Sequence, residues 1–135
     1  MATIELNEKN FESTVTEEGK TVFVDFWAPW CGPCRTFGPV FEAASERHAD
    51  IVWAKVNTQD EQGIAAALDI QSIPTLMVFR DGVLLFAQKG MLPAKILDEV
   101  ADKVRSLDMA EVKQKIAEEE AKQKAEAPAK AAPAE

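Results

Sequence analysis

Residues 21–27 form a continuous run of apolar and β-branched side chains, TVFVDFW, that only Asp25 interrupts. A run of this kind, without alternation of polar and apolar residues, is typical of a strand that is buried on both faces of a sheet. The run therefore predicts a central strand over residues 21–27, in a domain whose helices cover both faces of the sheet.

Strand and helix patterns alternate along the rest of the first 108 residues, and no internal repeat is present. Asp81-Gly82 lies between two short apolar runs, which is a strong signal for a β-hairpin. The other expected strands are 3–6, 51–56, 75–79 and 83–88. Apolar residues at helical spacing predict helices over 34–48, over 62–68 and from Pro93 to Leu107, and a further helix is expected around 7–16. We therefore expect a single α/β domain with a mixed sheet.

The composition changes near Asp108, beyond which the chain is almost entirely Ala, Glu, Lys and Gln. We expect a folded domain over residues 1–108 and a separate tail over 109–135. Asp108 and Glu111 have the spacing of a capping box, which predicts that a new helix starts there. The Ala/Pro-rich stretch after Ala127 is expected to be disordered.

Charge and hydropathy exclude several classes of function. The formal net charge is -8, which argues against nucleic acid or an anionic membrane surface as a partner. No apolar run approaches the roughly 20 residues that span a bilayer, and residues 1–10 lack the basic and apolar regions of a secretory signal. Two cysteines and one histidine cannot complete a tetrahedral zinc site from Cys and His alone. We expect no bound metal, no nucleic acid and no membrane as partner.

Both cysteines lie in one motif, Trp30-Cys31-Gly32-Pro33-Cys34, at the expected start of a helix. Backbone N–H groups and the helix dipole stabilise a thiolate there, so Cys31 is the candidate nucleophile and Cys34 the resolving thiol. A structural disulfide is disfavoured because nothing marks the chain as secreted. Half of a metal site would need carboxylates or a second chain to complete it. A C-x-x-C motif beside a βαβ pattern therefore favours redox chemistry.

Asp25 interrupts a strand that should be buried, where an ionised carboxylate is expensive. One interpretation is that Asp25 lies at a strand edge and reaches water. The other is a buried carboxyl with a raised pKa that exchanges a proton with Cys34. We favour the second interpretation.

Trp27, Trp53 and His48 have no expected catalytic role. Trp27 is expected in the core next to the cysteines, and Trp53 is expected to fill the core elsewhere. His48 comes late in its helix, so we expect an exposed imidazole near the carboxyl end of that helix.

The stretch Val24–Cys34, VDFWAPWCGPC, resembles the thioredoxin family, and Gly32-Pro33 between the cysteines is similar to its disulfide-reducing branch. The resemblance covers about residues 3–107 and leaves the tail outside. It implies a thioredoxin-like three-layer sandwich, with a central mixed sheet and helices on both faces. Three further places agree with the family at the expected spacing: Ile73-Pro74-Thr75, Asp81-Gly82 and Gly90.

The resemblance also implies roles for individual residues. Asp25 matches the carboxyl that exchanges a proton with the second cysteine, and Lys55 matches a lysine near that carboxyl. Pro74 matches a cis-proline that faces the cysteines, beside which an extended target segment adds as a strand. Lys89 departs from the family pattern and puts a charge at the edge of this docking surface. The residues implied for the docking surface are Trp30, Gly32, Pro33, Ile73, Pro74 and Gly90.

The function that the resemblance implies is that of a cytoplasmic protein-disulfide reductase and electron carrier in cell redox homeostasis. As a thiol–disulfide oxidoreductase it would bind no cofactor, and NADPH would supply electrons through a separate flavoprotein, a thioredoxin reductase. The other partners would be disulfide-containing proteins, and we expect a monomer. An oxidase or isomerase is an alternative against which Gly32-Pro33 argues. A pure binding module is another, against which the presence of Cys31, Cys34 and Asp25 argues.

Overall fold

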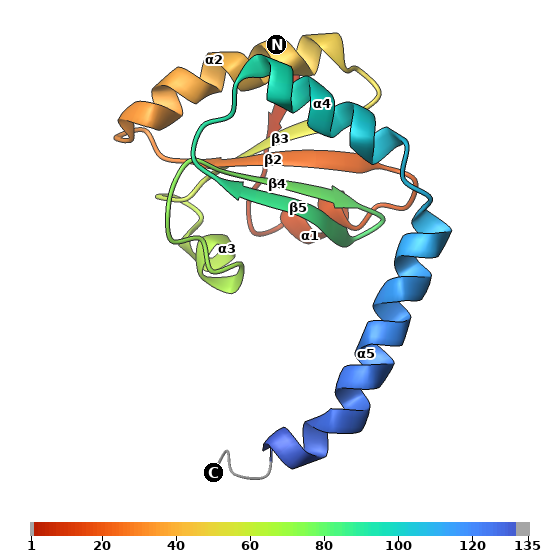
Figure 1. Ribbon diagram of the computed structural model, residues 1–135. Helices are drawn as coiled ribbons and strands as arrows, with labels where there is room; N and C mark the ends of the chain where they lie inside the picture. The colour runs from red at the N-terminus through yellow and green to blue at the C-terminus, as the bar shows by residue number, and fades with distance from the viewer. Residues whose placement is uncertain (1, 132–135) are drawn as a thin grey trace. The chain divides into compact units, whose positions relative to one another are not determined.

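The computed structural model describes residues 2–131, with side chains described as far as Lys124. The chain divides into two compact units, Met1–Ala101 and Asp102–Glu135. In the first unit, helices cover both faces of a five-stranded sheet, with α2 and α4 on one face and α1 and α3 on the other (Figure 1). In chain order the elements are β1 Thr3–Glu5, α1 Phe11–Val15, β2 Thr21–Trp27, α2 Gly32–Arg47, β3 Val52–Asn57, α3 Gln62–Ala67, β4 Thr75–Arg80, β5 Val83–Lys89, α4 Ala94–Arg105 and α5 Met109–Ala131.

The sheet has the strand order β1-β3-β2-β4-β5, so the apolar run over residues 21–27 is the central strand, as predicted. Strands β1, β3 and β2 are parallel, whereas β2 pairs with β4, and β4 with β5, in antiparallel fashion. The expected three-layer α/β sandwich with a mixed sheet is thereby confirmed.

One row of cross-strand partners places charged residues beside the centre of the sheet. Asp25 on β2 is the partner of Lys55 on β3 and of Leu76 on β4. Lys55 is in turn the partner of Glu5 on β1. Because side chains directly opposite one another in a sheet point to the same face, Glu5, Lys55 and Asp25 share one face of the sheet.

The two faces of the sheet carry separate cores. Phe23 on β2 packs on Trp53 of β3, with ring centroids 4.5 Å apart, and Trp53 meets Phe41 of α2 edge-on at 5.1 Å. Trp53 is only 1% exposed, which confirms its expected place in the core. The opposite face buries a second cluster, made of Leu6, Val15, Val22, Val24, Phe26, Ala54, Val56, Ile64, Met77 and Phe79.

The hairpin between β4 and β5 turns at Asp81-Gly82, as predicted. Both residues have left-handed backbone angles, with φ of 53° at Asp81 and 78° at Gly82. Glycine adopts that conformation without steric cost and aspartate tolerates it, which is why this dipeptide suits a two-residue hairpin. The Asp81 carboxylate also accepts a hydrogen bond from the Gly19 N–H at 2.6 Å, which ties the turn to the loop before β2.

The first helix is shorter than expected, because residues 7–10 form a turn instead of a helix. The Asn7 side chain accepts hydrogen bonds from the backbone N–H groups of Lys9 and Asn10, and the Asn10 side chain accepts one from the Asn7 N–H. Asparagine competes with helical hydrogen bonds in this way, so α1 begins only at Phe11.

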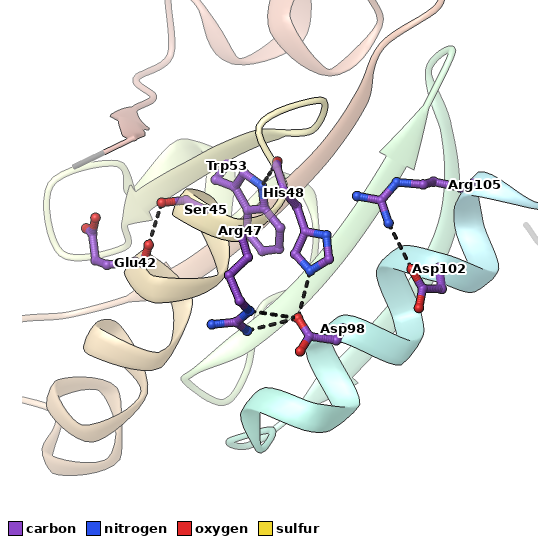
Figure 2. A network of polar contacts seen from close by, with 8 residues as sticks. All are labelled: Glu42, Ser45, Arg47, His48, Trp53, Asp98, Asp102 and Arg105. Carbon is purple, nitrogen blue, oxygen red and sulfur yellow. Dashed lines mark hydrogen bonds and ion pairs between the residues drawn. The ribbon is translucent and has the colours of Figure 1, made fainter.

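The end of α2 is held against α4 by one carboxylate. Figure 2 shows Asp98 of α4 facing Arg47 and His48, whose Nη2 and Nε2 atoms lie 2.9 Å and 2.7 Å from Asp98 Oδ1. The Trp53 indole N–H donates to the His48 carbonyl oxygen at 3.0 Å. The expectation of an exposed imidazole is therefore wrong. The His48 side chain is 12% exposed because α4 and Trp53 lie against it.

We expect Asp98→Asn to lower the free energy of unfolding by about 0.5–1 kcal/mol at pH 7. The hydrogen bonds from His48 and Arg47 lower the pKa of Asp98 in the folded protein, so its stabilisation is present above the pKa of the unfolded chain and is lost as the pH falls through the folded pKa. The effect is small because the carboxylate is 38% exposed. Urea unfolding at pH 7 and pH 3 tests this, with Asp102→Asn on the same helix as control. An equal loss at both pH values would contradict it.

The second unit contains α5, Met109–Ala131. Asp108 caps the start of this helix, since its Oδ1 accepts hydrogen bonds from the N–H groups of Ala110 at 3.0 Å and Glu111 at 3.3 Å. The predicted new helix start is therefore found. The helix continues past Ala127, after which disorder was expected, and residues 132–135 lie outside the described residues. The predicted domain boundary at residue 108 stays a prediction.

Candidate active site

The two cysteines lie where the central strand passes into α2. They form a disulfide, with Cα atoms 5.2 Å apart. Cys31 is the N-cap residue of α2, and its Sγ accepts a hydrogen bond from the Cys34 N–H at 3.2 Å. Pro33 occupies the first turn of the helix, where its missing N–H costs nothing. Cys31 thus lies at the positive end of the helix dipole, as the sequence predicted.

Two further segments meet the cysteines at this point. The Ile73–Pro74 peptide bond is cis, as the resemblance implied, and the Ile73 carbonyl oxygen lies 3.7 Å from Cys31 Sγ. The Gly90 N–H donates to the Pro74 carbonyl oxygen at 2.8 Å. Gly90 has a φ of 90°, a left-handed conformation that favours glycine. The structure therefore brings Ile73, Pro74 and Gly90 together beside Cys31.

The surface around the cysteines carries exposed apolar side chains. Cys31 itself is only 5% exposed, whereas Trp30 beside it is 67% exposed. Gly32 and Pro33 are exposed as well, and so is Lys89 at the end of β5. Met91 is 44% exposed directly after Gly90 and was not among the residues that the sequence suggested.

Asp25 lies at the centre of the sheet, not at a strand edge. It is 1% exposed, and neither of its carboxyl oxygens has a hydrogen-bond partner among the described residues. Burial raises the pKa of Asp25 from 3.8 to about 7, Lys55 opposes this rise, and Glu42 and Glu5 add to it. Such a carboxyl can take up and release a proton near neutral pH.

A cavity of about 530 Å³ lies beside Cys34, between α2 and the strands β2 and β3. The Lys55 ammonium is held there, 3.9 Å from Glu42 Oε2 and 4.9 Å from the centre of the Trp27 ring. The cavity joins the resolving cysteine to the charged side chains beside Asp25. Its lining residues are Trp27, Cys34, Arg35, Gly38, Pro39, Glu42 and Lys55.

Glu42 and Arg35 are site residues that the sequence reasoning did not find. Cys34, Gly38 and Glu42 are spaced four residues apart, so they share one face of a helix. That spacing was visible in the sequence. The sequence did not show which strands this face of α2 packs against, so Glu42 could not be placed beside Lys55.

Other kinds of site are not found in the described part of the chain. Residues 2–131 contain no group of three or more His, Cys, Asp or Glu side chains placed to hold a metal ion. None of the helices described there is both long and apolar enough to cross a bilayer.

The chain matches known proteins over most of its length. The Thioredoxin family model matches residues 2–103. "Putative thioredoxin 2" of Streptomyces coelicolor is 48% identical over 120 residues, which is 89% of each chain. "Thioredoxin 1" of Synechococcus elongatus is 40% identical over 99 residues, covering 73% of this chain and 92% of the relative.

Solved structures agree with these matches. The crystal structure of Malassezia sympodialis thioredoxin superposes with a TM-score of 0.68 at 28% sequence identity. The match covers 76% of this chain and 93% of that one.

Proposed function

Because this chain belongs to the thioredoxin family, we propose that its disulfide reduction begins at Cys31, is completed by Cys34 and uses Asp25 as the proton acceptor. The chain is a thiol–disulfide oxidoreductase of the disulfide-reducing kind, with Cys31 and Cys34 as its redox-active pair. The observation that carries the assignment of roles is the position of Cys31 at the N-cap of α2.

In the first step the Cys31 thiolate attacks one sulfur of a target disulfide. A bond forms between Cys31 Sγ and that sulfur, and the other target sulfur leaves as a thiolate. The hydrogen bond from the Cys34 N–H to Cys31 Sγ supports this role, because the same N–H and the helix dipole favour negative charge on Cys31.

In the second step Cys34 resolves the mixed disulfide. The Cys34 thiol gives its proton to the Asp25 carboxylate, and Cys34 Sγ attacks Cys31 Sγ. The bond between Cys31 and the target breaks, so the target leaves fully reduced and the Cys31–Cys34 disulfide remains. The cavity that Cys34 shares with Lys55, the cross-strand partner of Asp25, supports a proton path through water.

The target is expected to bind as an extended segment beside Ile73 and Pro74. The proximity of the Ile73 carbonyl to Cys31 Sγ supports this, because backbone pairing there would bring a target sulfur to Cys31. Exposed Trp30, Gly32 and Pro33, together with half-buried Gly90, would complete the docking surface.

Each turnover leaves the cysteines oxidised, so two electrons and two protons must be returned by another protein. We assign this to a separate flavoprotein reductase that takes electrons from NADPH. A dithiol carrier that reduces other proteins works only where thiols are kept reduced, which supports a cytoplasmic location. We further assign the working state as a monomer, because one chain carries both cysteines and the docking residues.

The reduction potential of the Cys31–Cys34 pair tests the direction of the reaction. We expect a potential more negative than that of the glutathione couple, measured by equilibrating the full chain in buffers of graded ratios of reduced to oxidised glutathione and trapping the thiols with an alkylating reagent. A potential more positive than that of glutathione would contradict this. It would favour the oxidase or isomerase alternative.

A further inference from the structure

Two contacts hold the Lys55 ammonium in the cavity between α2 and the sheet. The ammonium lies 3.9 Å from Glu42 Oε2 and over the Trp27 ring at 4.9 Å. A cation over an indole face gains electrostatic energy from the ring. The Lys55 side chain is only 15% exposed, so its charge is poorly screened by solvent.

Glu42 is itself fixed in place by β1. Its Oε2 atom accepts a hydrogen bond from Thr3 Oγ1 at 2.8 Å, so one carboxylate oxygen faces both the strand hydroxyl and the lysine. The second oxygen, Oε1, is buried without a hydrogen-bond partner among the described residues. Glu42 is therefore part of the lining of the cavity and not a solvated surface acid.

The charged groups around Asp25 lie on the neighbouring strands and on α2. Lys55 is its partner on β3, Glu5 lies one strand further on β1, and Glu42 acts on it from α2. Cys34 lines the same cavity as Glu42 and Lys55. On the other side of Asp25, β4 presents Leu76, which carries no charge. The proton affinity of Asp25 thus depends on how strongly the positive charge of Lys55 acts on it, and on how strongly Glu42 and Glu5 offset that charge.

We propose that Glu42 is a positioning residue for disulfide exchange, which holds the Lys55 ammonium near α2 and so keeps Asp25 a strong enough base to deprotonate Cys34. This inference rests on the proposed proton exchange between Cys34 and Asp25. Glu42 touches neither cysteine nor the target in this reaction, and its effect is transmitted through Lys55.

The chemistry follows from the sign of the charges. A lysine that is free to approach Asp25 stabilises the ionised carboxylate and lowers the proton affinity of Asp25. A lysine that is also paired with Glu42 stabilises the Asp25 carboxylate less. Deprotonation of Cys34 moves one proton to Asp25, and a weaker base makes that transfer less favourable. Loss of the Glu42 charge should therefore move the titration of Asp25 to lower pH.

The test is a pH titration of the Asp25 carboxyl carbon by NMR in the oxidised full-length chain. We expect Glu42→Gln to lower the midpoint by on the order of half a pH unit, and Glu42→Asp, which keeps the charge, to shift it by less than half as much. In a Lys55→Gln background, the midpoint shift caused by Glu42→Gln should be less than half of the shift seen with Lys55 present. Only the direct repulsion between Glu42 and Asp25 remains there. Glu46→Gln, an exposed change on the same helix, is the matched control.

Two outcomes would overturn the inference. One is an unchanged midpoint in Glu42→Gln, and the other is an equal shift with and without Lys55, which would leave only direct repulsion between the two acids. The rate at which Cys34 resolves a mixed disulfide, measured in Asp25→Asn across pH 6 to 9, tests the proposed function separately. An unchanged rate there would remove Asp25 from the mechanism, while the NMR titration would still report on Glu42.

Discussion

Replacing Cys31 by serine is expected to reduce the rate of protein-disulfide reduction by at least about 10³-fold, to the rate of the small dithiol reductant alone. A serine hydroxyl at the N-cap of α2 keeps the helix intact, since serine is a good N-cap residue. It does not ionise near neutral pH, however, so the first bond to the target sulfur cannot form. The loss of rate would thus come from chemistry and not from unfolding.

Cys34→Ser should abolish turnover as well, but by a different route. Cys31 still attacks the target, and with no second thiol to resolve it the mixed disulfide accumulates. Mass spectrometry of the protein with a disulfide-containing target should find one covalent adduct per chain in Cys34→Ser and none in Cys31→Ser. Adducts in Cys31→Ser alone would reverse the two roles.

The same pair of variants separates the enzyme from a binding module. A protein that used only its docking surface would keep its affinity for partners and its cellular role when both cysteines are replaced by serine. We expect the double variant to lose disulfide reduction completely. Retention of the function in a cell that depends on this chain would contradict the redox assignment.

The parts of the fold that sequence predicts well are those fixed by local patterns. The run over residues 21–27 needed only its apolar character to be placed at the centre of the sheet, and Asp81-Gly82 needed only its left-handed backbone preference. The start of α1 was missed because side-chain hydrogen bonds of Asn7 and Asn10 hold residues 7–10 in a turn.

In the candidate site, too, sequence reveals the residues with local signals and misses those that depend on distant contacts. Cys31, Cys34 and Asp25 are visible in one short stretch, because their chemistry and their neighbours in sequence coincide. Glu42 was not visible, since its meaning depends on contacts with Thr3 and Lys55 across two other strands. His48 was misjudged for the same reason, because only the folded chain brings Asp98 to it.

Asp25→Asn is expected to stabilise the oxidised protein at pH 8 by roughly 4 kcal/mol. Burial raises the pKa of Asp25 to about 7 from 3.8, so between these pH values the folded state binds more protons than the unfolded state. The free energy of unfolding of the wild type therefore falls as the pH rises through this window. Asparagine has the same shape and does not ionise, so it escapes this cost.

The pH dependence makes this prediction specific to the charge. Below about pH 4 a protonated Asp25 and an asparagine are both neutral and equally unpaired, so the two proteins should unfold at nearly the same urea concentration. The difference should grow up to pH 7 and then level off. Working with the disulfide intact removes thiol ionisation from the comparison, and Asp60→Asn, at an exposed position before α3, is the control for a lost surface charge.

The burial that makes Asp25 destabilising is also what suits it to proton exchange. The carboxylate destabilises the fold by the same desolvation that brings its pKa near the pH at which Cys34 must lose a proton. Asp25→Asn should therefore be more stable and slower in the resolving step at once. A variant that is less stable at pH 8 would mean that Asp25 is held ionised by Lys55 and not neutralised by burial. An equal gain at pH 4 and pH 8 would also contradict the prediction, because such a gain does not depend on ionisation of Asp25.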